Sequence, residues 1–317
     1  MPASPGLRDV TFSSGNVVLA GSLALPGREA PVLAGVVMVG GSGPSDRDND
    51  TYFPPIRRHL TGAGIAVLSY DKRGVGGSSG DWRDATMDDL AADAAAALDF
   101  LRAHPDVRAG ATGLFGHSEG GWVVLRATAA RGDVPWVVTS SCPGMTPAAQ
   151  ERHALASHLR QARGTTQQDI DSALAVYDRL VEAGRNGSSF AEAARIIDSA
   201  GNPPAFAGYW AGMDERLWTF VRRKQDHDPI PDALRLRCPH LAVFGGADQL
   251  VPVPDSIRLF SDAACHPDRP DRATLTVAVF PGASHRIQAN AGTHLAPGYL
   301  HTLTQWIKAR ADIGPDT

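Results

Sequence analysis

Short apolar runs alternate with helical patterns along most of this 317-residue sequence, and this alternation constrains the fold more than any other feature. A continuous apolar run of about four to eight residues, bounded by glycine or proline, is typical of a strand buried on both faces. Such runs occupy 32–39, 65–70, 111–115, 136–140, 240–244 and 275–280. Helical patterns occupy 54–63, 86–103, 119–130, 254–262 and 294–311. Strands that alternate with helices predict an α/β fold, with helices on both faces of a mostly parallel sheet.

Two segments depart from this alternation. Near the start, apolar and polar residues alternate over 10–25 with a break at 13–16, which predicts an antiparallel hairpin. From 145 to 231 no strand-like run occurs, and helical patterns at 147–163, 167–183, 190–199 and 209–224 are separated by turns. We therefore predict a core formed by 1–144 and 232–317, which carries a helical cap (lid) insertion at 145–231.

The balance of charge excludes several classes of partner. Apolar residues make up 43% of the chain, which is enough to fold around a large core. The 30 basic residues against 34 acidic ones give a net charge of -4, so we expect neither nucleic acid nor an anionic membrane as a partner. The longest apolar stretch is too short to span a bilayer, and no secretory signal pattern is visible. We expect a cytoplasmic protein.

The three cysteines offer no site of their own. Cys142, Cys238 and Cys265 are widely spaced and form no C-x-x-C pair. This pattern argues against a disulfide framework and offers no zinc site. We expect each of them to be a small buried hydrophobic residue.

The segment 116–121 reads G-H-S-E-G-G and lies between a predicted strand and a predicted helix. A nucleophile in such a position needs a very tight turn, with small residues two positions before and after it, as Gly116 and Gly120 are. The turn would place the Ser118 hydroxyl at a helix N-terminus, where N–H groups and the dipole stabilise negative charge. A bare G-x-S-x-G match arises by chance, but this context favours a catalytic serine over a turn that merely packs a helix on a sheet.

A serine hydroxyl needs a general base, which a carboxylate orients. Asp248 follows the predicted strand 240–244, and His285 follows the predicted strand 275–280. Open α/β sheets place functional groups beyond the carboxyl ends of their strands. Alone, Asp248 also suits a turn or helix cap, and His285 a loop. His294 and His301 compete for the role of base, but both fall in the predicted terminal helix.

The strand at 32–39 ends in the loop G-G-S-G-P-S-D-R-D at 40–48. Acyl transfer needs two N–H donors aimed at the oxyanion. We expect one from Glu119, the residue after the nucleophile, and the other from Gly41 or Ser42, where glycines let the backbone approach closely. A phosphate-binding loop is the rival interpretation, but the sequence has no G-x-x-x-x-G-K-[ST] or G-x-G-x-x-G motif that would support it.

A second loop, Y-D-K-R-G-V-G-G-S-S-G at 70–80, follows the next predicted strand. Its glycines allow sharp turns. We expect it to support the first loop, with its charges paired locally to the segment Asp46–Asp48, rather than to contact substrate.

Taken together, these segments resemble the α/β-hydrolase superfamily, most of all its bacterial serine carboxylesterase and dienelactone-hydrolase-like branch, which shades into serine aminopeptidases. The resemblance covers 32–144 and 238–311, and the insertion matches no family we can name. It implies the α/β-hydrolase fold, a triad of Ser118, His285 and Asp248, an acyl-enzyme intermediate, and neither cofactor nor metal. The loop reads G-G-S-G here and not the H-G-G-G of many lipases and esterases, so the resemblance does not assign the second oxyanion donor.

We therefore predict a serine hydrolase that cleaves carboxylic esters or thioesters of a small to medium organic molecule. A serine aminopeptidase or amidase is an alternative, which would need a carboxylate in the insertion to hold a substrate amine. The carboxylates available for this are Glu182, Glu192, Asp214 and Glu215. Further alternatives are a biosynthetic acyltransferase or cyclase with the same triad, and a binding module without catalysis.

The insertion is rich in aromatic residues, and two roles suit them. They either line an apolar substrate pocket or join the insertion to the core. The residues concerned are Tyr209, Trp210, Trp218 and Phe220. The oligomeric state stays open, with a homodimer as one alternative.

Overall fold

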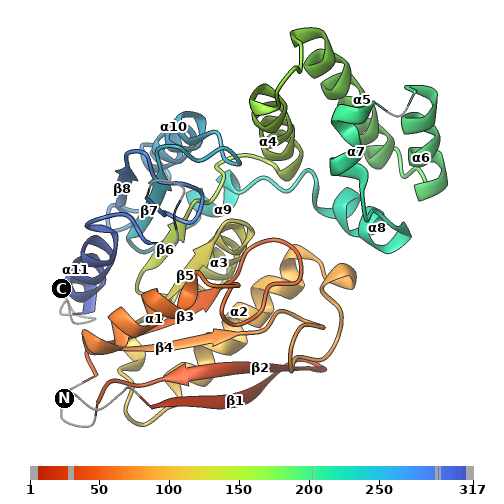
Figure 1. Ribbon diagram of the computed structural model, residues 1–317. Coiled ribbons are helices and arrows are strands. Elements are labelled where there is room, and N and C mark those ends of the chain that lie inside the picture. Colours follow the sequence, from red (N-terminus) through yellow and green to blue (C-terminus); the bar gives the residue numbers. More distant parts are fainter. Residues whose placement is uncertain (1–5, 28–31, 202, 290–291, 293, 312–317) are drawn as a thin grey trace.

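The computed structural model describes residues 6–27, 32–201, 203–289, 292 and 294–311, and its centre is one eight-stranded sheet (Figure 1). The strands are β1 (Leu7–Ser14), β2 (Val17–Ala24), β3 (Ala34–Val39), β4 (Ile65–Tyr70), β5 (Thr112–His117), β6 (Val137–Ser140), β7 (His240–Gly245) and β8 (Leu275–Phe280). Their order in the sheet is β1-β2-β4-β3-β5-β6-β7-β8. The predicted α/β sheet is confirmed, with each strand within a few residues of its predicted place.

The sheet is antiparallel at one edge and parallel elsewhere. The predicted hairpin is β1 and β2, joined by a turn at Gly15 and Asn16, and β2 also pairs antiparallel with β4. From β4 to β8 all neighbours are parallel. The loops that follow β3, β5, β7 and β8 therefore leave the sheet at the same edge, which is where the predicted site residues lie.

Helices cover both faces of the sheet. One face packs against α1 (Phe53–Gly62) and α11 (Tyr299–Ala311). The other packs against α2 (Met87–Arg102), α3 (Glu119–Arg131), α9 (Ile230–Leu234) and α10 (Val253–Ala264). The helix predicted at 294–311 begins only at Tyr299, because Gly298 has a left-handed φ of 83° that a helix cannot include. His294 consequently lies in a loop and not in a helix.

Between β6 and β7 the chain forms α4 (Pro147–Gln161), α5 (Gln167–Arg185), α6 (Phe190–Ser199), α7 (Pro204–Trp210) and α8 (Glu215–Lys224) before α9. Buried residues of these helices, among them Leu159, Ile170 and Tyr177, make an apolar core separate from those of the sheet. The single helix predicted at 209–224 is wrong. It divides into α7 and α8, because Asp214 caps a new helix by accepting a hydrogen bond from Leu217 N–H at 2.7 Å.

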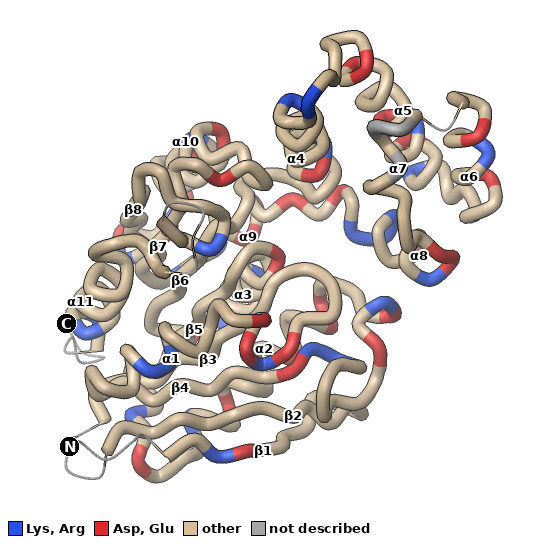
Figure 2. Tube along the Cα trace, viewed as in Figure 1, with Lys and Arg blue, Asp and Glu red and all other residues tan. Residues whose placement is uncertain are grey.

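Helix α8 attaches this insertion to the core at a short 3₁₀ helix, η1 (Trp82–Asp84). The rings of Phe220 and Trp82 meet edge to face at 4.9 Å, and Arg216 forms an ion pair with Asp84 at 2.7 Å. Figure 2 shows acidic and basic residues interspersed along the trace, in keeping with the balanced composition.

Two findings bear on the composition arguments. In the described ranges, no helix has the length and apolar character needed to cross a membrane. Cys142 and Cys238 are buried as predicted, whereas Cys265 is exposed, because it follows the last residue of α10 at the molecular surface. The expectation of burial was wrong for that one cysteine.

Candidate active site

Ser118 lies between β5 and α3 with φ 54° and ψ -121°, a backbone conformation that residues with a side chain rarely adopt. Its N–H donates to the Ser140 carbonyl at 2.9 Å, which helps hold the turn. A side chain at Gly116 would collide with the backbone of Gly120, and one at Gly120 with the Val39 carbonyl. Close backbone contact therefore imposes the small residues that the sequence shows on either side of Ser118.

His285 and Asp248 form a hydrogen-bonded pair. His285 Nδ1 lies 2.7 Å from Asp248 Oδ2, and the Asp248 side chain is fully buried. The other oxygen, Oδ1, accepts hydrogen bonds from Leu250 N–H at 2.9 Å and Val251 N–H at 3.1 Å. These backbone donors fix the carboxylate, so that it can orient the imidazole and stabilise its protonated form.

Ser118 and His285 line one cleft of about 460 Å³, together with Gly41 and Ser42. The fold thus brings the predicted serine, histidine and oxyanion loop to one cavity, with Asp248 behind the histidine. Among the described residues no hydrogen bond joins Ser118 Oγ to His285, and bonds of this kind often tighten only around a substrate. His294 and His301 are exposed and do not line this cleft.

The two residues considered for the second oxyanion donor differ in their hydrogen bonds. Gly41 N–H donates to Asn49 Oδ1 at 3.3 Å. Within the described ranges, the N–H groups of Ser42 and of Glu119, the first residue of α3, have no such partner. The geometry therefore favours Ser42 over Gly41, a choice that the sequence left open.

Asn49 and His117 connect the loop at 40–48 to the loop of His285, and the sequence analysis missed both. Asn49 Nδ2 lies 2.9 Å from His117 Nδ1, and His117 Nε2 lies 3.3 Å from the carbonyl oxygen of His285. Burial lowers the pKa of His117 well below its ordinary value of 6.5, which keeps the ring neutral. The network then assigns Nδ1 as the acceptor from Asn49 and Nε2–H as the donor to His285. The left-handed φ of 45° at Asn49 suits asparagine, the one signal that the sequence carried.

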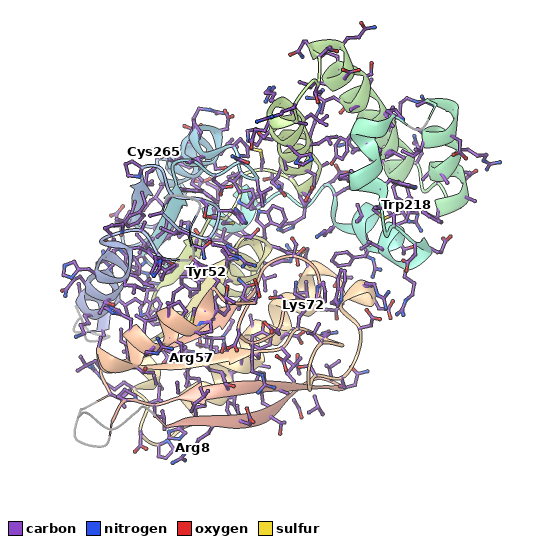
Figure 3. The ribbon with its side chains drawn as sticks, in the orientation of Figure 1. Arg8, Tyr52, Arg57, Lys72, Trp218 and Cys265 are labelled. Carbon is purple, nitrogen blue, oxygen red and sulfur yellow. The ribbon has the colours of Figure 1, made fainter. Side chains whose placement is uncertain are left out.

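A buried ion cluster lies beneath the loop at 40–48. The Glu119 carboxylate pairs with Lys72 at 2.8 Å and also with Lys224, the last residue of α8. Burial opposes the charge of Glu119, but the two ammonium groups outweigh it and lower its pKa to about 2. Lys72 also donates to the Gly41 carbonyl. Figure 3 labels Lys72 in the core below the insertion. The chain has only three lysines, and two of them meet here.

The loop at 70–80 supports the loop at 40–48, and one of its charges pairs within the predicted segment 46–48. Asp71 pairs with Arg47 at 2.7 Å, and Lys72 pairs with Glu119. Asp46 and Asp48 have other partners. Asp46 accepts hydrogen bonds from N–H groups within its own turn, and Asp48 pairs with an arginine of α1. The predicted pairing with the segment 46–48 is therefore confirmed at Arg47, whereas Asp46 and Asp48 themselves do not pair with the loop at 70–80.

A second hollow, here called the aromatic cavity, has a volume of about 170 Å³ and lies between the insertion and the core. Tyr209, Trp210 and Trp218 line it, as expected if the aromatic residues of the insertion form a pocket. Phe220 instead packs on Trp82, as expected if they join the insertion to the core. Trp218 is labelled among the insertion helices in Figure 3. The full lining is Ser42, Trp122, Pro147, Ala148, Gln150, Glu151, Tyr177, Leu180, Val181, Tyr209, Trp210, Met213, Trp218, Val221, Lys224 and Gln225.

Glu151 is the carboxylate of the insertion that faces the site, and the sequence analysis did not consider it. It lines both the cleft at Ser118 and the aromatic cavity. The four carboxylates that were considered line neither, because they serve the ends and surfaces of their own helices. Glu192 and Asp214 cap helices, Glu182 bonds Asn186, and Glu215 is exposed.

Comparison with known proteins agrees with this geometry. The family model described as serine aminopeptidase, S33, matches residues 49–193. The esterase Pf2001 of Pyrococcus furiosus is 18% identical with a TM-score of 0.60, over 97% of this chain and 90% of that one. The α/β-hydrolase GrgF from a Penicillium species is 18% identical with a TM-score of 0.63, over 97% and 100%. This chain has the α/β-hydrolase fold.

Two further comparisons bear on this fold. Dienelactone hydrolase from Anabaena variabilis is 18% identical with a TM-score of 0.51, and 96% of each chain is covered. No curated protein matches the sequence. At these identities the solved structures establish the fold alone. The family model spans the serine turn and the first helices of the insertion, but it ends before Asp248 and His285.

Proposed function

We propose that this protein is a serine hydrolase that cleaves carboxylic esters or thioesters through an acyl-enzyme on Ser118. The observation that carries the proposal is the shared cleft. Ser118, in a strained turn at the N-terminus of α3, faces the same hollow as His285, whose other ring nitrogen is bonded to the buried Asp248. Nucleophile, base and orienting carboxylate are the three parts that acyl transfer by serine requires.

The chemistry assigns a proton to each step. As Ser118 Oγ attacks the acyl carbon, His285 Nε2 accepts the hydroxyl proton and Asp248 stabilises the imidazolium. The N–H groups of Glu119 and Ser42 bind the oxyanion. His285 returns the proton to the leaving alkoxide or thiolate as the bond to it breaks. Water then attacks the acyl-enzyme, His285 accepts a proton from it, and Ser118 Oγ leaves with that proton. These steps need no cofactor. In this scheme the helices at 145–231 act as a cap over the cleft.

The test is hydrolysis of p-nitrophenyl acetate, butyrate, octanoate and laurate by the wild type and by Ser118→Ala. We expect the wild type to hydrolyse some of them and the variant to lose about three to six orders of magnitude in kcat. Ser199→Ala, an exposed serine on α6, is the matched control and should keep full activity. A wild type that hydrolyses no ester, and whose Ser118 a fluorophosphonate does not label, would mean a binding module instead.

A serine aminopeptidase is the second function that a specific observation favours, because the matching family model carries that description. Glu151 would then be the carboxylate that holds the substrate amine, since it faces the cleft. Amino-acid p-nitroanilides distinguish the two functions. If their kcat/KM exceeds that of matched p-nitrophenyl esters, the protein is an aminopeptidase. An acyltransferase or cyclase would be distinguished by its products with a non-water acceptor.

A further inference from the structure

The aromatic cavity has a size that limits what it can hold. A protein cavity of roughly 150 Å³ is known to bind a benzene molecule. At about 170 Å³, the aromatic cavity is of similar size, so a group the size of one six-membered ring is the one that it matches. Trp122 of the core and Trp218 of the insertion are both almost fully buried, so its aromatic walls are fixed by packing.

The cavity adjoins the catalytic cleft directly. Ser42, Gln150 and Glu151 line both hollows. Ser42 also belongs to the oxyanion loop, so a substrate whose carbonyl lies at Ser118 passes this residue to enter the cavity. A ring attached a few bonds from the scissile carbonyl therefore has a place to bind.

Glu151 gives this junction a polar group without a partner. In the described part of the chain its carboxyl makes no hydrogen bond or ion pair, although it is partly buried and lines the aromatic cavity with Tyr209. Burial is the largest influence on its pKa and raises it. Such a carboxyl gains most from a ligand that brings a hydrogen-bond donor.

The charges nearby indicate which donor is suitable. Lys224 lines the same cavity, and Lys72, Glu119 and Lys224 together carry one net positive charge. An ionised Glu151 balances that charge, and an ammonium group on the ligand would disturb the balance, whereas a hydroxyl would not. We propose that the aromatic cavity binds one ring-sized apolar group of the substrate, and that Glu151 selects substrates with a hydroxyl on that group. This inference rests on the proposed function, because it assigns the substrate class of that site.

Matched esters test the size and the hydroxyl separately. The acyl series consists of methyl esters, and chromatography measures the released acid. Its first two members are the esters of acetic acid and 3-phenylpropanoic acid. The others are the esters of the 3-hydroxyphenyl, 4-hydroxyphenyl and 4-(aminomethyl)phenyl analogues of 3-phenylpropanoic acid and of 3-(2-naphthyl)propanoic acid. The acetates of 2-phenylethanol and 2-(4-hydroxyphenyl)ethanol place the same ring on the alcohol side. In at least one series we expect the phenyl ester to exceed the ester without a ring at least 10-fold in kcat/KM. A hydroxyl should add about 10-fold more, mainly through KM.

Variants of Glu151 test the selecting residue. Glu151→Leu removes the acceptor and should abolish the preference for the hydroxyl, whereas Glu151→Gln keeps a neutral acceptor and should retain most of it. The matched control is Glu182→Leu, an exposed glutamate of α5, which should behave as the wild type. Val221→Phe fills the cavity and should lower the ratio of phenyl ester to acetate ester at least 5-fold.

Several results would overturn the inference. Equal kcat/KM for the ring esters and the acetate esters in both series would overturn the role of the cavity, and so would a naphthyl ester with a kcat/KM as high as that of the phenyl ester. A preference for the hydroxyl that survives in Glu151→Leu would overturn the role of Glu151. A higher kcat/KM for the aminomethyl ester than for the hydroxyl ester would overturn it as well.

A binding measurement separates this inference from the proposed function. In Ser118→Ala, the hydroxyphenyl ester should bind without being cleaved and should quench tryptophan fluorescence as it binds. In the double variant Ser118→Ala, Glu151→Leu the dissociation constant should be about 10-fold higher. If the wild type hydrolyses no ester but this binding persists, only the proposed function fails. If this binding is absent, the inference fails.

Discussion

The core and the insertion contribute to the same site by different means. In the core, backbone contacts set the geometry. Gly116 meets Gly120 at the serine turn, and Asp248 is held by the N–H groups of Leu250 and Val251. The insertion reaches the site through side chains, above all Lys224 on Glu119. Backbone contacts restrict residue types strongly, whereas side-chain contacts between helices allow many combinations. The core should therefore tolerate far less change than the insertion.

Replacing Asp248 by Asn gives the largest expected effect and tests the core half of this comparison. The amide cannot hold His285 in the required tautomer or stabilise its charge, so kcat should fall about 10⁴-fold, with KM little changed. Steady-state hydrolysis of p-nitrophenyl esters measures kcat and KM, and circular dichroism checks that the variant is folded. A loss below 10-fold would mean that another carboxylate orients the histidine.

Acid should weaken the cluster that joins the two regions. The pKa of Glu119 in the folded protein is about 2, below its ordinary value of 4.5, so the charged form favours the folded state. The resulting stability is fully present above about pH 4.5 and is lost as the pH falls toward 2, at most on the order of 3 kcal/mol. Urea unfolding at a series of pH values measures this loss.

The control for the acid experiment is Glu119→Gln, which removes the titrating group. Its free energy of unfolding should be lower at neutral pH and should change less between pH 4.5 and 2. An identical pH slope in the variant and the wild type would assign the acid sensitivity to other carboxylates.

Replacing Lys224 by Met tests the insertion half of the comparison. Glu119 then keeps Lys72 but loses one buried partner, and the free energy of unfolding should fall by about 2 kcal/mol. Because the Glu119 N–H is an expected oxyanion donor, kcat should fall as well, by about 10-fold. Lys224→Arg keeps the charge and should restore part of both quantities. Full activity in Lys224→Met would show that the insertion and the oxyanion loop act independently.

The smallest effect is expected at the exposed contact between α8 and η1. Arg216 and Asp84 are both well exposed, so solvent and salt screen their ion pair. Arg216→Ala should change the free energy of unfolding by less than about 1 kcal/mol, with kcat unaffected. A loss as large as that of Lys224→Met in thermal unfolding would mean that this contact, and not the buried cluster, holds the insertion in place.

The same contrast explains what the sequence could predict. The six strands from β3 to β8 follow from apolar runs, and the hairpin of β1 and β2 follows from alternation. Ser118 follows from glycines that its turn requires. The relation of Asp248 to His285 follows from strand order, since parallel strands end at one edge. The choice between Gly41 and Ser42 as oxyanion donor depends on Asn49, because its side chain accepts a hydrogen bond from the Gly41 N–H. Only the folded loop brings Asn49 near Gly41. Glu151 is one of several carboxylates on amphipathic helices, and its direction depends on how α4 packs. The left-handed conformation of Gly298 makes α11 begin later than predicted, and the sequence shows there only a glycine that follows a proline.

The scarcity of lysine has a practical consequence for chemical labelling. Lys72 and Lys224 are largely buried with their ammonium groups held by Glu119, while Lys308 lies on α11 at the far end of the chain and is partly exposed. Of the three side-chain amines, an amine-reactive dye or solid support should therefore attach first at Lys308, which does not line the cleft at Ser118. Reaction at Lys224 would require α8 to leave Glu119. The rate of its modification, followed by mass spectrometry, would thus report how often the insertion opens.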